Sequence, residues 1–473
     1  MKRTKIIATV GPSCEDEATL RHLITLGVNV FRLNFKHNNL DWHRATARRI
    51  HEICESSDVH VGVLLDLQGP EIRVVLSGDQ IDLVENEPVP FGTADFNITH
   101  PEILEHIVDG QEVVVNDGQF HLTFERRGHE MVLVPQASGV LKNRKSMNMP
   151  GGEFPLDVLT ERDFDGIKLA AEEHIDFVAL SFARTAQDVQ ILKKAMKEAG
   201  ATSKIISKIE ARQAISNLDA IIEESDAVMV ARGDLGVEIP IEQVPHYQKK
   251  IIRKCFSRGV PVITATQMLE SMIENPYPTR AEVSDVANAV LDLTDAVMLS
   301  GESALGKYPS ESVNMMARTV IFNENTKLTE DTRRIYRYQL DTPVQHICDA
   351  AYNIYDSGCH NNEFAGFLVL SKTGRTAQLI SRYRPGVPIF TYVPTAEIAK
   401  SLALNYGIYS MVKKASDDSK REVEREYIDE CLAQLTADSI VPENSQIIVV
   451  HGDYWGIIGG ASTIRIVRTP KLK

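Results

Sequence analysis

The length, composition and charge of the chain limit the classes of protein to which it can belong. Its 473 residues suggest about three domains, and an apolar share of 43% with a charged share of 25% is ordinary for a globular protein. The 51 basic and 65 acidic side chains give a net charge of −14, which argues against non-specific binding to nucleic acid or to an anionic membrane surface.

The cysteines and the apolar runs indicate the compartment. The six cysteines are scattered without a Cys-x-x-Cys pair, which argues against a zinc site or a disulfide framework and favours the reducing cytoplasm. The apolar run at residues 6–10 is too short for the core of a signal peptide, and no stretch reaches the roughly 18 apolar residues that span a bilayer. We therefore expect a cytoplasmic protein with neither nucleic acid nor membrane as partner.

Eight short apolar runs, bounded by turn residues, are separated by segments of helical period. They cover residues 5–10, 30–35, 61–67, 177–182, 204–209, 227–232, 261–266 and 296–301. Helix starts are predicted at Ser13 and Thr160, and helix ends at Gly27, Gly200 and Gly259. Eight strand–helix units predict a (β/α)₈ TIM barrel of the α/β class. A doubly wound open sheet is the alternative, and the first strand lacks the Gly-x-Gly-x-x-Gly turn typical of it.

Two regions lie outside the eight strand–helix units and define the other domains. Residues 70–149 contain short alternating strands among Gly, Asn and Asp turns, which predicts an inserted β-barrel lid domain. Residues 341–473 resume an alternation of strands and helices and predict a C-terminal α/β domain, after a polar linker at 329–334. The barrel then comprises residues 1–69 and 150–330.

Charged and hydroxyl side chains stand at the carboxyl ends of the eight predicted strands. In a TIM barrel these ends form a single rim, which carries the active site. Any one of these residues can be an ordinary polar loop residue, but ionised groups directly after apolar runs are costly unless they are paired or bind a ligand. The rim set is Arg32, Asn34, Asp66, Ser181, Arg184, Lys208, Glu210, Arg232, Asp234, Thr266, Ser300 and Glu302.

The rim indicates metal-assisted chemistry on an anionic substrate. Glu210 and Asp234 end neighbouring strands, and two adjacent carboxylates without His or Cys favour Mg²⁺ or Mn²⁺. The alternative is that Glu210 and Asp234 bind no metal and instead form salt bridges with Lys208 and Arg232. These cations, with Arg32 and Arg73, are suited to a phosphoryl group in transfer. The hydroxyls of Thr266 and Ser300, with Glu302, are candidates for moving a proton, although such hydroxyls more often cap helices.

Several long motifs occur in order along the chain, and together they resemble pyruvate kinase over almost its whole length. They lie at residues 4–12 (TKIIATVGP), 32–35 (RLNF), 69–73 (GPEIR), 206–210 (ISKIE), 229–238 (MVARGDLGVE), 264–272 (TATQMLESM), 278–282 (PTRAE) and 298–302 (MLSGE). The resemblance implies transfer of the phosphoryl group of phosphoenolpyruvate to ADP, giving pyruvate and ATP in glycolysis. It also implies a homotetramer.

The resemblance further implies roles for individual residues. Glu210 and Asp234 would hold Mg²⁺ or Mn²⁺, and the catalytic set would be Lys208, Arg32, Thr266, Ser300 and Glu302. Substrate would contact Arg32, Lys208, Gly233, Asp234, Thr266 and Ser181. The nucleotide would contact Asn34, His37, Arg73 and the lid residues Asp117 and Lys145.

The monovalent-cation site is where this chain departs from the family pattern. The pattern has Ser at Lys36, and Asp-Thr-Lys-Gly-Pro where this chain has Asp66-Leu67-Gln68-Gly69-Pro70. The K⁺ set here would be Asn34, Lys36, Asp66 and Leu67. We hypothesise that the Lys36 ammonium replaces K⁺ near Asp66; the alternatives are that Lys36 points to solvent, or that Glu71, an acid associated with K⁺ dependence in the family, marks a K⁺-dependent enzyme.

A second binding site is expected in the C-terminal domain. Ser371, Lys372, Thr373, Gly374, Arg375 and Thr376 follow a predicted strand and open a helix, which resembles the effector loop of the family for a sugar phosphate or nucleotide. An ordinary strand-to-helix turn is the alternative. Trp455, in the loop at 451–462, is a candidate cover for that effector. The competing function is a catalytically weak relative that binds sugar phosphate or a protein.

Overall fold

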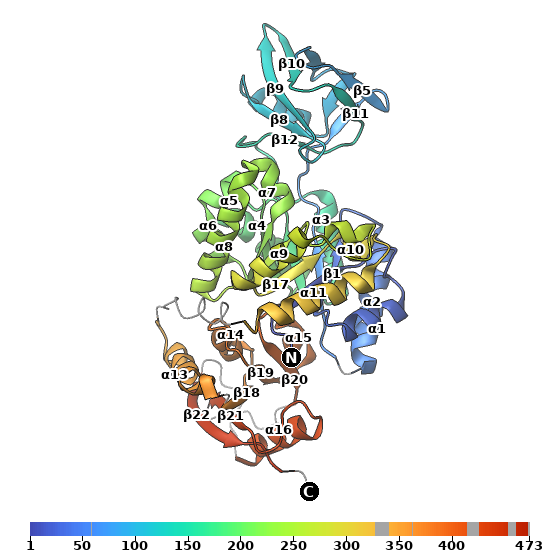
Figure 1. Ribbon diagram of the computed structural model, residues 1–473. Coiled ribbons are helices and arrows are strands. Elements are labelled where there is room, and N and C mark those ends of the chain that lie inside the picture. Colours follow the sequence, from blue (N-terminus) through green and yellow to red (C-terminus); the bar gives the residue numbers. More distant parts are fainter. Residues whose placement is uncertain (58, 327–339, 362, 414–424, 453–459, 472–473) are drawn as a thin grey trace.

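The computed structural model describes residues 1–57, 59–326, 340–361, 363–413, 425–452 and 460–471. Figure 1 shows three parts stacked along one direction: a small β unit, a central barrel ringed by helices, and a C-terminal α/β unit. The expected linker at 329–334 and Trp455 lie outside the described residues. Within the described ranges, no helix is long and apolar enough to cross a membrane.

Eight parallel strands close into a barrel in the order β1-β17-β16-β15-β14-β13-β3-β2. This closure confirms the predicted TIM barrel and excludes the open sheet. Their bounds are β1 Lys5–Thr9, β2 Val30–Asn34, β3 Gly62–Asp66, β13 Phe177–Leu180, β14 Lys204–Ile209, β15 Ala227–Ala231, β16 Val262–Ala265 and β17 Ala296–Leu299. The apolar runs therefore located every barrel strand to within one or two residues.

Helices cover the outside of the barrel, and their apolar faces form a core with the strands. They are α1 Glu17–Thr25, α2 Leu40–Ser57, α3 Glu161–Glu172, α4 Ala186–Ala199, α5 Arg212–Ser216, α6 Leu218–Glu224, α7 Arg232–Glu238, α8 Val244–Arg258, α9 Arg280–Leu291, α10 Gly301–Ala304 and α11 Pro309–Asn323. Single turns of 3₁₀-helix lie at η2 Ile241–Gln243 and η3 Glu270–Ile273.

The helix ends follow local capping chemistry, with one exception to the prediction. Thr160 caps α3 in a reciprocal box with Asp163, and Gly200 and Gly259 end α4 and α8 in left-handed conformation, as expected. The predicted start at Ser13 is wrong. The cap of α1 is Asp16, whose carboxylate accepts the N–H of Thr19 at 2.9 Å, because the carboxylate reaches the first turn from that position.

Between β3 and α3 the chain forms a separate β unit, which stands beyond one end of the barrel in Figure 1. It has its own core, in which Phe91 contacts Phe96 and Phe124 edge-on. Its elements are β4 Val74–Leu76, β5 Gln80–Leu83, β6 Val89–Phe91, β7 Phe96–Ile98, η1 Pro101–His106, β8 Glu112–Val115, β9 Phe120–Arg127, β10 Glu130–Pro135, β11 Gly139–Lys142 and β12 Met147–Asn148. We call this unit the lid.

The C-terminal unit is a five-stranded sheet in the order β20-β19-β18-β21-β22, with β22 antiparallel to its neighbour. Its strands are β18 Phe364–Leu370, β19 Ile389–Val393, β20 Ile408–Val412, β21 Gln446–Gly452 and β22 Ala461–Arg468. Its described helices are α13 Pro343–Gly358, η4 Cys359–Asn361, α14 Arg375–Ser381, α15 Ala396–Ser401 and α16 Arg425–Ala437. A buried ion pair between Arg384 and Asp295, with a 2.6 Å contact, joins this unit to the barrel.

Candidate active site

The first cluster of the rim is a buried ion network at the ends of β2, β3 and β14. Arg32 Nε donates to Asp66 Oδ2 at 2.7 Å, and Arg32 Nη1 donates to Thr9 Oγ1 at 3.0 Å. Lys208 Nζ donates to Ser181 Oγ at 2.8 Å and lies 3.4 Å from Asp66 Oδ1. Because parallel strands of a barrel end at the same mouth, residues distant in sequence meet here.

The opposite charges in this network stabilise one another's ionised forms. Burial alone would raise the pKa of Asp66, but the charges of Lys208 and Arg32 outweigh it and lower that pKa. Burial opposes the charge of Lys208, yet the carboxylates of Asp66, Glu210 and Asp234 raise its pKa above the usual value. Lys208 and Asp66 are therefore held in their ionised forms at neutral pH.

Glu210 is a deeply buried acid of the rim, and only one of its two carboxylate oxygens is hydrogen-bonded. Oε1 accepts the N–H of Phe182 at 2.6 Å. Oε2 lies 3.3 Å from Lys208 Nζ but accepts no hydrogen bond. Burial and the neighbouring Asp234 raise the pKa of Glu210 to about 7, against the opposing charge of Lys208. A buried oxygen without a donor is costly, and a cation would satisfy it.

The donor set fits a hard divalent cation. In the described part of the chain, no three His, Cys, Asp or Glu side chains are grouped to hold a metal. Mg²⁺ does not need such a cage, since one or two carboxylates with water and substrate oxygens complete its shell. The orphaned Oε2 of Glu210, with Asp234 on the adjacent α7, meets that requirement.

A second cluster joins the ends of β15 and β16. Thr266 has a φ of +66°, a strained conformation for a β-branched residue. Its Oγ1 donates to the carbonyl of Ala265 at 2.7 Å and accepts the N–H of Gly233 at 2.8 Å. The hydroxyl therefore faces the first turn of α7, beside the residues expected to bind substrate.

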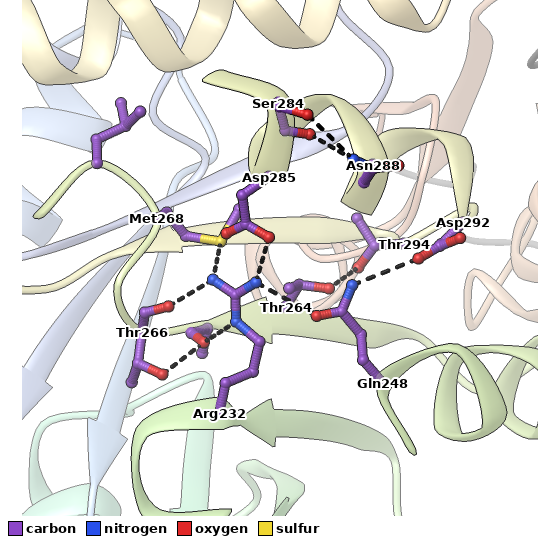
Figure 2. A network of polar contacts seen from close by, with 12 residues as sticks. Arg232, Gln248, Thr264, Thr266, Met268, Ser284, Asp285, Asn288, Asp292 and Thr294 are labelled. Carbon is purple, nitrogen blue, oxygen red and sulfur yellow. Dashed lines mark hydrogen bonds and ion pairs between the residues drawn. The ribbon is translucent and has the colours of Figure 1, made fainter. Parts of the chain in front are cut away.

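Arg232 does not contribute its charge to the opening, which corrects the prediction made for it. Figure 2 shows its guanidinium surrounded by protein acceptors. It pairs with Asp285 at 2.6 Å and donates to the carbonyls of Ala265 and Thr266 at 3.1 and 2.6 Å. The alternative of a salt bridge to Asp234 is also wrong, because the partner is Asp285 on α9. Arg232 thus holds the end of β15 against β16 and α9.

Ser300 and Glu302 lie together at the end of β17. Glu302 is fully buried, and its two oxygens accept the N–H groups of Leu269 at 3.0 Å and Ser300 at 2.7 Å. A carboxylate engaged in this way orients two loops and has little freedom to carry a proton. The geometry therefore favours a positioning role for Glu302 over the predicted relay.

The Lys36 ammonium lies beside the first crossing into the lid. Lys36 Nζ donates to Glu71 Oε1 at 2.6 Å, while the other oxygen of Glu71 accepts two bonds from Arg73. Asp66, the expected partner, is occupied by Arg32 and Lys208. The prediction that Lys36 lies on Asp66 is therefore wrong, because Glu71 is the carboxylate within its reach. The solvent-facing alternative is not observed either.

The remaining members of the expected K⁺ set are engaged within the protein. Asn34 Oδ1 accepts the backbone N–H of Lys36 at 3.3 Å. The Leu67 side chain is buried and apolar, and its carbonyl accepts the hydroxyl of Ser181 at 2.7 Å. Neither residue offers a free oxygen ligand comparable to a carboxylate.

The residues expected to contact nucleotide are divided between barrel and lid. Burial and the charges of Lys36, Arg32 and Arg73 lower the pKa of His37, so its ring is neutral at pH 7. On the lid, the Ser146 hydroxyl donates to Asp117 Oδ1 at 2.7 Å. Lys145 lies next to Ser146, half-buried, at the base of the lid.

Two cavities separate the lid from the barrel rim. One, of about 520 Å³, is lined by Lys36, Glu71 and Asp234 among others. The second, of about 640 Å³, is lined by Arg232 and Gly233 among others. The lid residue Asp117 lines both cavities. Their sizes are typical of small-molecule sites, which occur at such domain boundaries.

The predicted effector residues form the β18–α14 connection. Gly374 has a φ of +79° and precedes α14, and an added Cβ would lie 2.7 Å from the Leu402 methyl groups. Ser371 and Thr376 are buried. Lys372, Thr373 and Arg375 are exposed.

Three residues near the site were missed by sequence reasoning or weighed differently. Asp285 gives no local sign that it pairs with Arg232, because it lies on a helix far along the chain. Glu71 was read as an argument for K⁺ dependence and is the partner of Lys36. Glu238 ends α7 beside Gly151 at the second lid crossing, and burial raises its pKa against the neighbouring N–H groups. The one sign of Glu238 in the sequence was its position shortly after the strand-to-helix turn at the end of β15.

Comparison with known proteins agrees with this geometry over the whole chain. Residues 1–313 match the family model described as the pyruvate kinase barrel domain, and residues 347–467 match that of the pyruvate kinase alpha/beta domain. A pyruvate kinase of Sporosarcina psychrophila is 37% identical, with 97% of this chain and 78% of the relative aligned. One of Bacillus licheniformis is 35% identical, over 99% of this chain and 80% of the relative.

The fold comparison gives the same result. The crystal structure of a pyruvate kinase from Cryptosporidium parvum superposes with a TM-score of 0.89 and 34% sequence identity. The match covers 99% of this chain and 96% of that structure. On the strength of both family models, these relatives and the shared architecture, the chain belongs to the pyruvate kinase family.

Proposed function

We propose that this enzyme transfers the phosphoryl group of phosphoenolpyruvate to ADP, giving pyruvate and ATP, at the barrel rim beneath the lid. The observation that carries the proposal is the buried Lys208, which lies between Asp66 and Glu210 while one Glu210 oxygen lacks a donor. A fixed cation beside an unsatisfied carboxylate is suited to a phosphoryl group and a divalent metal together.

The protein groups supply charge and orientation. Arg32 is held by Asp66 and Thr9 at the end of β2, so its guanidinium is fixed where it would clamp the phosphate. Lys208, held by Ser181, would stabilise negative charge on the moving phosphoryl group and on the enolate. Because these groups are already oriented, little reorganisation is needed during transfer.

Glu210 and Asp234 would hold Mg²⁺ or Mn²⁺. When bound, this ion neutralises charge on phosphate, carboxylate and enolate oxygens. Gly233 and Asp234 would receive the substrate carboxylate at the first turn of α7. The N–H of Gly233 is bonded to Thr266 in this structure, so binding through that group requires Thr266 to release it.

After transfer the enolate must receive a proton at carbon. Thr266 presents its hydroxyl at the end of β16, with Ser300 at the end of β17. Thr266 would pass the proton through ordered water, and Glu302 would hold the Ser300 backbone in place. The lid, carrying Asp117 and Lys145, would bind the nucleotide phosphates with Arg73 and His37 and exclude water.

A coupled assay with phosphoenolpyruvate, ADP and Mg²⁺ tests the proposal. We expect turnover in the wild type and a loss of at least about 100-fold in Lys208→Gln, the scale of a lost transition-state charge contact. Lys193→Gln is the matched control, because Lys193 is an exposed lysine paired with Glu224. Absence of turnover at every K⁺ and Mg²⁺ concentration, with or without sugar phosphates, would support the weak, ligand-binding relative instead.

We further propose that Lys36 replaces an activating K⁺ ion. Its ammonium lies 2.6 Å from Glu71, at the mouth of the cavity shared with Asp234. Glu71 no longer argues for K⁺ dependence, since Lys36 and Arg73 already neutralise it. Turnover measured in tetramethylammonium buffer without K⁺ should match that with K⁺. A large loss restored by added K⁺ would reject this part of the proposal.

Regulation and assembly are also proposed from the family. We expect the 371–376 segment to bind a phosphorylated effector and the enzyme to be a homotetramer. Light scattering measures the mass in solution, and a species other than four chains would contradict the assembly. The dependence of turnover on phosphoenolpyruvate, with and without sugar phosphates or nucleotides, tests the regulation.

A further inference from the structure

The β2–α2 loop, which carries Lys36, is held by the first turn of α3, the helix that follows the lid. Arg162 Nε donates to the carbonyl of Phe35 at 2.9 Å. Its Nη2 donates to the carbonyls of Asn38 at 2.7 Å and His37 at 3.4 Å. The guanidinium also lies over the Phe35 ring, 5.0 Å from the centroid. A planar fork that reaches several carbonyls at once fixes the shape of the loop on both sides of Lys36.

The next residue, Asp163, holds the first crossing into the lid. Its fully buried carboxylate accepts the N–H of Gln68 at 2.8 Å and the N–H of Gly69 at 3.2 Å. Gly69 has a φ of +69°, which suits glycine, and the chain turns here toward Glu71. The same carboxylate closes the capping box with Thr160 at the start of α3. Asp163 thus ties the start of α3 to the segment that carries Glu71.

Close packing on α3 and α2 supports the same two loops. A Cβ added at Gly166, one turn further along α3, would lie 2.9 Å from side-chain atoms of both Phe35 and Leu67. From α2, His43 Nε2 lies 2.8 Å from the carbonyl of His37. Burial lowers the pKa of His43 to about 4, so its neutral ring donates to that carbonyl through Nε2. The loops therefore have little room to shift against α3.

The two loops meet at the ion pair between Lys36 and Glu71, whose Nζ and Oε1 atoms lie 2.6 Å apart. Both residues line the cavity of about 520 Å³ beneath the lid, together with the lid residue Asp117. Arg162 and Asp163 are adjacent on α3, so one helical turn holds both partners of the pair. A shift of one loop relative to the other must therefore break contacts to this turn.

We propose that Arg162 and Asp163 are positioning residues that orient the nucleotide side of the active site through Lys36. The inference rests on the phosphoryl transfer to ADP proposed above and extends it, since neither residue is among the described residues that line the cavity. The first turn of α3 holds the ammonium where it meets the phosphates of ADP. Lys208, on the phosphoenolpyruvate side, is held by Ser181 instead, so Arg162 acts on ADP and not on phosphoenolpyruvate.

Calorimetric titration of the full chain with ADP and Mg²⁺, and separately with phosphoenolpyruvate and Mg²⁺, tests the proposal without turnover. Arg162→Gln should bind ADP about tenfold more weakly and phosphoenolpyruvate less than about twofold more weakly, because only the nucleotide loop loses its order. Arg48→Gln is the matched control, with both affinities unchanged. Arg48 also joins α2 to α3, but through Glu173 at the far end of α3, with a 2.7 Å contact and 60% of its side chain exposed.

A double-mutant cycle with Lys36→Ser tests whether Arg162 acts through that lysine. In the Lys36→Ser background, Arg162→Gln should weaken ADP binding by less than about threefold, because the two changes remove one shared effect. If Arg162→Gln fails to fold, Arg162→Lys replaces it. That variant keeps the charge but lacks the fork, so we expect an ADP loss of about threefold with unchanged phosphoenolpyruvate affinity.

Three results would overturn the inference. The first is unchanged ADP affinity in Arg162→Gln, which in an enzyme that turns over normally leaves the proposed catalytic function standing. The second is an equal loss of affinity for ADP and phosphoenolpyruvate, which shows a general loosening of the barrel. The third is full additivity of Arg162→Gln and Lys36→Ser. A wild type that binds both ligands without turnover, with the ADP loss confined to Arg162→Gln, would instead count against the catalytic function alone.

Discussion

Replacing Lys208 by methionine probes the buried charge network of the rim. The ammonium lies 3.3 Å from Glu210 Oε2 and 3.4 Å from Asp66 Oδ1. At an effective dielectric constant of about 20, each pair contributes roughly 5 kcal/mol of attraction, most of which offsets desolvation. Removing one partner of such a buried group costs about 3–5 kcal/mol. We expect Lys208→Met to lose that much barrel stability at pH 8.

Urea unfolding followed by tryptophan fluorescence measures this loss. The chain has two tryptophans, so a Trp455→Phe background leaves Trp42 as the reporter. Trp42 lies on α2 of the barrel, where its indole N–H donates to Glu15 at 2.6 Å. The unfolding transition seen by Trp42 is therefore that of the barrel.

Lys193→Met is the matched control, because that lysine pairs with Glu224 at 2.6 Å on the surface, with 43% of its side chain exposed. Exposed pairs contribute about 0–1 kcal/mol, so this variant should unfold within about 1 kcal/mol of the wild type. Equal losses in Lys208→Met and Lys193→Met would refute the reasoning that Lys208 is held by buried charge.

Three further outcomes follow from particular contacts. Lys36→Ser should make turnover depend on K⁺, measured by titrating K⁺ in tetramethylammonium buffer; K⁺-independent turnover in this variant would show that Lys36 supplies no needed charge. Burial raises the pKa of Asp176 to about 7, so its contribution is favourable at low pH and is lost as pH rises from about 4 to 7. In thermal melts, the melting temperature of Asp176→Asn should fall less over that pH interval than the melting temperature of the wild type. An equal fall in both proteins would contradict the raised pKa of Asp176. Gly374→Ala should cost about 1–3 kcal/mol in urea unfolding, because φ is +79° and its Cβ would contact Leu402; an unchanged midpoint would count against strain there.

The strands and their rim residues were predictable from the sequence because barrel strands are buried on both faces. Such strands appear as continuous apolar runs, and the first polar residue after each run lies at the mouth. Glu210 was located in this way, and Lys208 lies two residues before it near the end of the same run; the structure brings the two side chains within 3.3 Å. The spacing alone could not assign their chemistry, which came from the resemblance.

The directions of the side chains were not predictable, since each depends on a partner distant in sequence. Arg232 lies at the carboxyl end of its strand, as Lys208 does, yet it turns toward Asp285, 53 positions further along the chain. Lys36 was expected on Asp66 and lies on Glu71. Glu302 is another case, because the N–H groups that saturate its carboxylate belong to two different loops.

The most direct test of the central claim follows the phosphorus atom. In a ³¹P NMR time course with phosphoenolpyruvate, ADP and Mg²⁺, the wild type should convert the phosphoenolpyruvate signal into the γ-phosphate signal of ATP. The conversion should stop when the metal is chelated and should be slowed at least about 100-fold in Lys208→Gln. Phosphoenolpyruvate that persists with the wild type at every Mg²⁺ concentration, or conversion at an equal rate in Lys208→Gln, would contradict the account.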